Sequence, residues 1–191
     1  MIPKIIMQTG KDKTLSVLAQ KASDTWKDLN VDYEHHYFDD EACKDFLINN
    51  YNKDVVLAFC LLKLGASKAD FFRYCYLYKK GGIYTDLDNI CLVPIDKYID
   101  HNADEFVSIL DVPHSADNHP MFKKTVECGN MIFENSKSYW IYQAFIATVP
   151  NNPILEKIIN IITINTLSRC MPDDSSTSWW EIRSDGAVIH L

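Results

Sequence analysis

Two aspartates, Asp86 and Asp88, are the residues most able to support chemistry, and only Leu87 separates them. In an extended or tightly turned backbone both carboxylates can reach one centre, and hard oxygen ligands of this kind suit Mg²⁺ or Mn²⁺. A divalent ion held there can neutralise the charge that develops on a departing diphosphate. The aspartates follow a short apolar stretch, residues 83–85, and ligand sites in α/β proteins lie beyond the carboxyl ends of strands. A solvent-exposed acidic turn would explain the same tripeptide.

A second pair, Asp70 and Arg73, lies three residues apart in a helical pattern, so the two side chains share a helix face. Aspartate accepts hydrogen bonds from sugar hydroxyls, and arginine binds hydroxyls or phosphate through its planar fork. Structural roles fit the pair as well. Ser67 and Asp70 have the spacing of a capping box, and Asp70 and Arg73 can pair with each other within the helix.

These residues belong to one continuous pattern over residues 68–88, with the sequence KADFFRYCYLYKKGGIYTDLD. The pattern closely resembles the signature of the DXD-containing glycosyltransferases. That family includes fungal initiating mannosyltransferases and α-1,4-galactosyltransferases, and the glucosylating domains of clostridial toxins share its signature. Residues 2–9 (IPKIIMQT) also resemble the family's first strand, with Met7 where histidine is common. The resemblance implies a GT-A fold, a nucleotide-binding α/β domain.

The resemblance also implies roles for individual residues. Asp88 is the expected principal ligand of Mn²⁺ or Mg²⁺, and Asp86 is expected to contact ribose or sugar and to share the metal. Asp70 and Arg73 are expected to orient the donor sugar, and these four charged residues form the expected catalytic set. The family often has asparagine before an Ala-Phe pair, where this chain has Gln143. The expected donor-binding residues are Gln8, Thr9, Asp70, Arg73, Tyr84 and Asp86.

The expected function is a metal-dependent glycosyltransferase that moves a hexose from a nucleotide-sugar to a hydroxyl group of a glycan or another acceptor. A UDP-hexose such as UDP-glucose is the first expected donor, and GDP-mannose is the second. Two other classes stay open. One is a phosphatase of the haloacid-dehalogenase type, which also places paired aspartates after a strand, and the other is a non-catalytic module that binds nucleotide-sugars or glycans.

A base that activates the acceptor hydroxyl is less well indicated. One loop after an expected strand carries candidates of the right chemical type, namely Asp111, His114, Asp117 and His119. The resembled family is generally retaining, with the departing phosphate assisting the acceptor, so a protein base is not required. Solvent-exposed loop residues would explain the same cluster.

The periodicity of apolar residues predicts the elements that position these side chains. We expect strands at residues 2–7, 31–38, 83–85, 90–93, 106–110 and 131–133. We expect helices at residues 15–29, 41–49, 54–64, 67–80, 139–149 and 154–167. The clearest helix has Ser67 as its N-cap and ends at Gly81 and Gly82. This alternation predicts an α/β fold with a mostly parallel central sheet flanked by helices. Residues 1–191 are expected to form a single glycosyltransferase domain, either alone or as one domain of a longer protein.

The composition excludes several classes. The chain has 191 residues, 47% of them hydrophobic, and a formal net charge of −7. A nucleic-acid partner is not expected, because no basic stripe is present to neutralise phosphates. Six scattered cysteines lack zinc-site spacing, which favours buried free thiols. No segment approaches a membrane span, so the chain as written is expected to be cytoplasmic or otherwise soluble unless an anchor has been removed.

Overall fold

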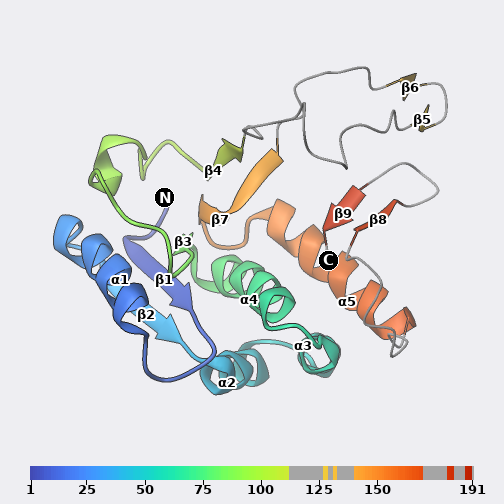
Figure 1. Cartoon of the computed structure of the whole chain (residues 1–191). Helices are drawn as coiled ribbons and strands as arrows, with labels where there is room; N and C mark the ends of the chain where they lie inside the picture. The colour runs from blue at the N-terminus through green and yellow to red at the C-terminus, as the bar shows by residue number, and fades with distance from the viewer. Residues whose placement is uncertain (112–126, 129–130, 133–139, 170–179, 183–187, 191) are drawn as a thin grey trace. The chain divides into compact units, whose positions relative to one another are not determined.

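The computed structural model describes residues 1–111, 127–128, 131–132, 140–169, 180–182 and 188–190 (Figure 1). The chain divides into two compact units. The first comprises residues 1–108 and 143–172, and the second comprises residues 109–142 and 173–191. Every residue expected to bind donor or metal belongs to the first unit, so the candidate site can be described within that unit alone.

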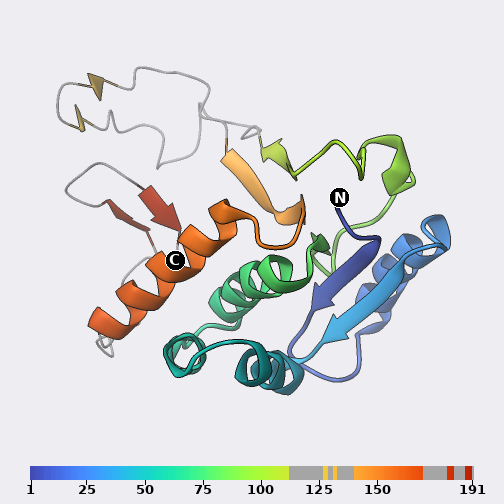
Figure 2. The ribbon, with the colours of Figure 1, turned by 180° about the vertical axis from the view of Figure 1, so that it is seen from behind.

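A central sheet organises the first unit. Its strands are β1 (Ile5–Thr9), β2 (Glu34–Phe38), β3 (Gly82–Thr85), β4 (Phe106–Asp111) and β7 (Trp140–Thr148). They lie in the order β2-β1-β3-β7-β4 (Figures 1 and 2). β1 pairs in parallel with β2 and with β3, whereas β3 pairs antiparallel with β7. The expected α/β fold is confirmed, with a mixed sheet.

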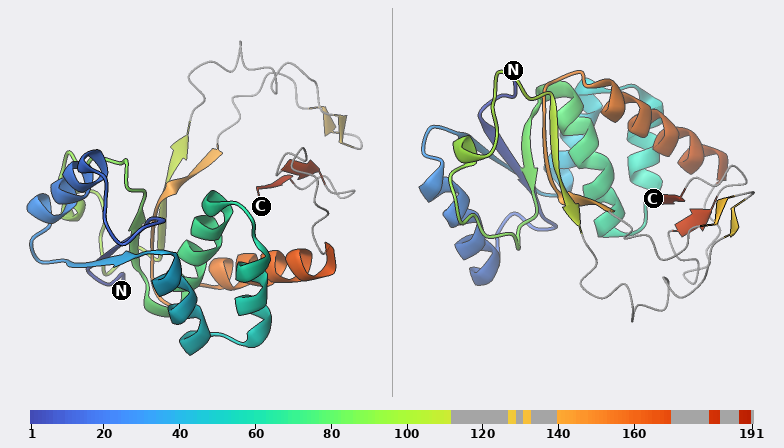
Figure 3. Two further views of the ribbon diagram at one scale, coloured as in Figure 1. Left: turned by 60° about the horizontal axis from the view of Figure 1, so that its bottom comes forward. Right: turned by 90° about the horizontal axis from the view of Figure 1, so that it is seen from above.

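Helices cover both faces of this sheet. They are α1 (Val17–Leu29), α2 (Asp40–Asn50), α3 (Lys53–Leu61), α4 (Gly65–Lys80), α5 (Pro153–Arg169) and the 3₁₀ helix η1 (Ile95–Lys97). α1 lies on one face, and α4 and α5 lie on the other (Figure 3). α2 and α3 pack beside α4 on that second face. The sheet is therefore the middle of three layers, and its strand ends are left for ligand binding.

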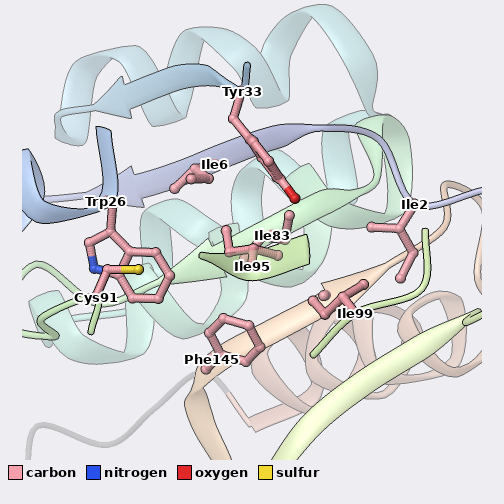
Figure 4. Close-up of a cluster of buried hydrophobic side chains, with 10 residues drawn as sticks. Ile2, Ile6, Trp26, Tyr33, Ile83, Cys91, Ile95, Ile99 and Phe145 are labelled. Carbon is pink, nitrogen blue, oxygen red and sulfur yellow. The ribbon is translucent and has the colours of Figure 1, made fainter. Parts of the chain in front are cut away.

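The apolar core beneath α1 joins that helix to three neighbouring strands (Figure 4). Ile6 of β1 and Ile83 of β3 are fully buried, and burial of each isoleucine contributes about 2 kcal/mol to stability. Trp26 of α1 stacks on Phe145 of β7 with ring centroids 6.1 Å apart. On the opposite face an aromatic cluster joins β2, α2 and α4, and it consists of Phe38, Phe46, Phe72 and Tyr76.

Two glycines make the sharp connection from α4 to β3. Gly81 ends the helix with φ 66°, and Gly82 begins the strand with φ 94°. A side chain at Gly82 would place its Cβ 2.7 Å from the carbonyl oxygen of Ile5 in β1. Glycine adopts such φ values at little cost, and its missing Cβ allows the two strands to approach. The expected helix stop is confirmed, and it brings β3 beside β1 directly after α4.

The strand expected at residues 90–93 is wrong, although its sequence is apolar. Side chains of α1 and of its C-cap take the hydrogen bonds that a neighbouring strand would otherwise supply. Thr25 Oγ1 accepts from the peptide N–H of Cys91 at 2.9 Å. Asn30 Oδ1 accepts from the N–H of Ile95 at 2.8 Å. The chain after Asp88 is thus held against α1 without joining the sheet.

The start of α4 also differs from expectation. The helix begins at Gly65, and its N-cap residue Leu64 makes no side-chain cap hydrogen bond. Ser67 is buried inside the helix rather than capping it. The capping-box explanation for Asp70 is therefore wrong, and Asp70 needs another role.

The helix expected at residues 139–149 is a strand, β7, where the structure describes it. It pairs with the whole of β3, from Gly82 opposite Thr148 to Thr85 opposite Phe145. Its aromatic and β-branched residues suit a strand, and a short apolar run of this length cannot be assigned by periodicity alone. All four residues of β3 are buried, so their backbone groups require partners on both sides, and β1 and β7 supply them.

Other element boundaries shift by a few residues. β1 extends through Gln8 and Thr9, which were expected to follow the strand, while Ile2 packs into the core ahead of it. α5 begins at Pro153, one residue before the expected range. The second unit contains two short antiparallel strand pairs: β5 (Glu127–Cys128) with β6 (Met131–Ile132), and β8 (Trp180–Ile182) with β9 (Val188–His190).

The cysteine expectation holds only in part. Among the residues described, Cys43, Cys75 and Cys91 are buried free thiols, whereas Cys60 is free and exposed. The side chains of Cys128 and Cys170 lie outside the described residues. Within the described part of the chain, no helix combines the length and apolar character that a membrane crossing requires.

Candidate active site

The acidic motif forms a tight turn at the carboxyl end of β3. Asp86 follows the strand, Leu87 and Asp88 form the turn, and the N–H of Asn89 donates to the carbonyl of Asp86 at 3.3 Å. The N–H of Asp86 donates to the carbonyl of Ala144 in β7 at 3.1 Å. The turn therefore lies at the edge where ligands bind in α/β sheets, and β7 fixes its first residue.

Arg73 is the centre of the site's hydrogen-bond network. Its guanidinium lies 2.7 Å from the carboxylate of Asp70 and 3.5 Å from that of Asp86. The same group donates to the carbonyl of Gln143 at 2.6 Å and stacks over the ring of Tyr84 at 4.2 Å. Only 6% of its side chain is exposed. The structure thus brings together the expected residues of α4, β3 and the turn.

The neighbouring groups keep the guanidinium of Arg73 protonated although it is buried. Burial alone would lower the pKa of the Arg73 guanidinium, but Tyr84, Asp70 and Asp86 together raise it above its ordinary value. Burial also raises the pKa of Tyr84; Arg73 lowers this pKa and Asp86 raises it. Because the net shift is upward, the phenol stays protonated and donates to Asp86. One buried cation therefore faces two carboxylates, and the exposed Asp88 adds a third negative charge nearby. A site with this excess of negative charge favours a cation.

The two aspartates of the turn have different environments. Asp86 directs Oδ1 at Arg73 and Tyr84, and 35% of its side chain is exposed. Asp88 is exposed, and within the described residues no donor binds its carboxylate. The described residues contain no cluster of three or more His, Cys, Asp or Glu side chains able to hold a metal. Two carboxylates with open positions suit an ion that takes its remaining ligands from water and phosphate.

The expected nucleotide-binding residues line the buried base of this site. Gln8 and Thr9 end β1, and both are buried. Gln8 accepts from Ser23 Oγ at 2.6 Å and donates to the carbonyl of Asp86 at 3.4 Å. Its amide therefore links α1 to the acidic turn. Tyr84 is 1% exposed, and its phenol is engaged with Asp86.

Three residues matter to the site although sequence reasoning gave them little or no role. Gln143 accepts from Arg73 through its carbonyl and from the Tyr74 hydroxyl through Oε1 at 2.6 Å. The side chain of Asn89 and the indole of Trp26 hold the turn itself. Backbone carbonyls carry no sequence signal, but Asn89 directly follows the motif, and a polar residue there was a visible cue.

The side chains of the candidate acceptor bases lie outside the part of the chain that the structure describes. Asp111 is the last residue of β4, and its side chain lies outside the described residues. His114, Asp117 and His119 lie outside them as well.

The chain has an α/β fold of GT-A-like architecture. The PaToxG glycosyltransferase has the same fold, with a TM-score of 0.55 and 18% sequence identity. The match covers 87% of this chain and 62% of that structure. Residues 16–105 match the family described as the glycosyltransferase sugar-binding region containing the DXD motif. This match confirms the resemblance of residues 68–88 to the DXD-containing glycosyltransferases.

Curated fungal mannosyltransferases are similar to the chain. An initiation-specific alpha-1,6-mannosyltransferase of Candida albicans is 37% identical over 52% of this chain and 28% of its own length. The Schizosaccharomyces pombe protein of that name is 31% identical over 86% of this chain and 40% of its own length. Inositol phosphoceramide mannosyltransferase 2 of Schizosaccharomyces pombe is 32% identical over 74% of this chain and 41% of its own length. The chain thus spans less than half the length of each of these relatives.

Proposed function

We propose that the chain transfers a hexose from a nucleotide-sugar donor to a hydroxyl group of a glycan or another acceptor, with a divalent cation bound at the acidic turn. The observation that carries this proposal is the cluster of Asp70, Arg73, Tyr84 and Asp86 beside the exposed Asp88. The cluster lies at the carboxyl end of β3, within the region that matches the glycosyltransferase family.

Asp86 and Asp88 are the proposed metal ligands. DXD glycosyltransferases generally use a divalent metal ion, and these two carboxylates suit Mn²⁺ or Mg²⁺ because both offer oxygen atoms at one turn. When bound, the ion neutralises charge on the departing nucleoside diphosphate. Arg73 holds Asp86 in place while Asp88 remains exposed to receive the ion.

Asp70 and Arg73 are proposed to orient the donor sugar. The carboxylate of Asp70 is 17% exposed and is held by the buried Arg73, so its position is fixed while part of it stays accessible. An oriented carboxylate can accept hydrogen bonds from sugar hydroxyls. Gln8, Thr9 and Tyr84 are proposed to form the buried floor beneath the ribose and base, which agrees with their places at the ends of β1 and β3.

The names of the relatives reverse the order of the two expected donors. The similar fungal proteins are mannosyltransferases, and none of the three described above is named for glucose. GDP-mannose is therefore the first proposed donor and UDP-glucose the second. The single-domain organisation of residues 1–191 remains a proposal, and so does the identity of the acceptor.

Calorimetric titration of the purified chain with GDP-mannose, UDP-glucose and UDP-galactose, with and without Mn²⁺, tests this function. We expect Mn²⁺-dependent binding, tightest for GDP-mannose. Asp88→Asn should weaken that binding by at least ~10-fold without lowering the melting temperature, because the residue is exposed and loss of a metal-site interaction costs ~10–100-fold. Asp28→Asn, an exposed carboxylate of α1, serves as the matched control.

Unchanged affinity of Asp88→Asn in the presence of Mn²⁺ would remove the metal assignment. Donor binding without hydrolysis or transfer across an acceptor panel would instead indicate a non-catalytic nucleotide-sugar module. Hydrolysis of a generic phosphomonoester that Asp86→Asn suppresses would indicate the phosphatase alternative.

A further inference from the structure

Asn89, the residue directly after the acidic motif, is half-buried, and its side chain holds the turn. Its side-chain N–H₂ donates to the carbonyl of Ala144 at 2.9 Å and to Thr85 Oγ1 at 3.2 Å. The carbonyl of Ala144 also accepts from the N–H of Asp86. One carbonyl of β7 therefore anchors both ends of the turn, and Asp88 lies between the two anchored residues.

A second anchor reaches Asn89 from α1. The indole N–H of Trp26 donates to the carbonyl of Asn89 at 2.8 Å. Trp26 is only 5% exposed and stacks on Phe145, the neighbour of Ala144 in β7. Figure 4 shows the indole among Cys91 and Phe145 in the core beneath α1. The backbone of Asn89 is thus held by α1 and its side chain by β7.

The hydrogen bonds of Asn89 fix the backbone of the turn in a way that favours binding of an ion, beyond their contribution to stability. The backbone around Asp88 is fixed by buried partners, while the carboxylate of Asp88 points out of that network and is exposed. A metal ligand on a fixed backbone loses little freedom on binding, and residues that orient ligands typically change metal affinity by ~10–100-fold.

We propose that Asn89 is the positioning residue that sets the spacing of the Asp86 and Asp88 carboxylates for a divalent cation, and that Trp26 locks Asn89 in place. The inference rests on the proposed metal-dependent donor site. Asn89 itself contacts neither the donor nor the ion, and it acts through the turn.

The test measures the Mn²⁺ concentration that gives half-maximal binding of GDP-mannose, together with the melting temperature. Asn89→Ala should raise that Mn²⁺ concentration by ~10–100-fold, while GDP-mannose affinity at saturating Mn²⁺ returns to within ~3-fold of wild type. Trp26→Phe keeps the stacked ring but loses the indole N–H, and it should shift the Mn²⁺ dependence in the same direction by a smaller factor. It tests the same anchor without removing the amide of Asn89.

Asn152→Ala is the matched control. Asn152 is 5% exposed, and its amide binds the carbonyl of Glu105 and the N–H of Ile154, away from the motif. It should lower the melting temperature about as much as Asn89→Ala does, because both remove part-buried hydrogen bonds of a side-chain amide, but it should leave the Mn²⁺ dependence unchanged.

The outcomes separate the two proposals. If wild type binds GDP-mannose in a Mn²⁺-dependent way and both asparagine variants leave the Mn²⁺ dependence unchanged, the positioning role is overturned and the donor site stands. Equal shifts in both variants overturn it too, because general loosening would then explain them. If wild type binds no donor with any metal, the proposed function fails, and the inference fails with it.

Discussion

At the scale of single residues, Arg73 organises the hydrogen bonds of the candidate site. Its position in the sequence suggests a ligand-binding cation, but the structure shows most of its hydrogen-bonding capacity used inside the protein, on Asp70, Asp86 and Gln143. An arginine suits this role because its planar fork serves several acceptors at once while its face stacks on Tyr84. Asp70 and Asp86, which are proposed to face the donor, depend on this buried cation for their positions.

Replacement of Arg73 should therefore destabilise the whole protein. Arg73→Met leaves two partly buried carboxylates without their cation, and we expect the free energy of unfolding to fall by about 3 kcal/mol. Arg73→Lys should recover only part of this loss, because an ammonium group cannot reproduce the fork or the stacking. Urea unfolding followed by circular dichroism measures both variants.

Lys80→Met, an exposed cation in the last turn of the same helix, is the control and should change stability by less than about 0.5 kcal/mol. If Arg73→Met and Lys80→Met proved equally stable, Arg73 would not be the structural centre described above.

At the scale of elements, the sequence predicts best where local signals and tertiary contacts agree. α4 and β3 are recognisable because two glycines mark their junction and the site residues lie at regular spacing around it. Residues 139–149 and 90–93 are assigned wrongly for one shared reason. Their apolar patterns allow more than one conformation, and the choice depends on distant partners: β3 for the first segment, and side chains of α1 and its C-cap for the second.

In the candidate site too, residues with a local sequence signal were predicted and contacts from distant segments were not. Asp70, Arg73, Tyr84 and Asp86 were named from one stretch of sequence, and the structure brings them together. The contribution of β7 could not be predicted, because it comes from carbonyl groups that every residue type carries.

The junction of α4 and β3 gives a prediction at this scale. Gly82→Ala should lower the free energy of unfolding by about 2–3 kcal/mol, since it combines a positive φ with a Cβ that would lie 2.7 Å from a backbone oxygen of β1. Gly65→Ala, in the first turn of α4, has open space around its Cβ and should be neutral or stabilising by about 0.5 kcal/mol.

Thermal unfolding of both glycine variants, with calorimetric enthalpies, measures the contrast. Because β1 and β3 also carry Gln8, Thr9 and the acidic turn, Gly82→Ala should weaken Mn²⁺-dependent donor binding as well. Equal melting temperatures for the two variants would show that this junction tolerates a side chain.

At the scale of the whole molecule, the negative charge of the protein supports the proposed use of a cation. The chain carries a formal charge of −7, and its candidate site adds local negative charge from Asp70, Asp86 and Asp88 around one buried arginine. An anionic nucleotide-sugar is repelled by both the general and the local charge. A divalent ion at the proposed site would remove the local repulsion, and an acidic protein could then bind a diphosphate there.

Global stability should depend on pH through His35 of β2. Its Nε2 is buried and has no hydrogen-bond partner among the described residues. Burial, and then Lys27 and His36, lowers the pKa of His35 below the ordinary value of 6.5. Below pH 6.5 the unfolded chain therefore takes up a proton at this residue while the folded protein still holds it neutral. The unfolded state binds more protons, so acidification from this pH towards the folded pKa lowers stability.

His35→Gln should flatten this dependence, because glutamine does not titrate. The free energy of urea unfolding should fall less between about pH 7 and about pH 5 in the variant than in wild type. Near pH 8 both states hold the residue neutral, so the difference between variant and wild type there measures the cost of altered packing alone. If the two proteins lost equal stability over the acidic range after this correction, His35 would be protonated as easily in the folded sheet as in the unfolded chain, and its burial beside Lys27 would carry no electrostatic consequence.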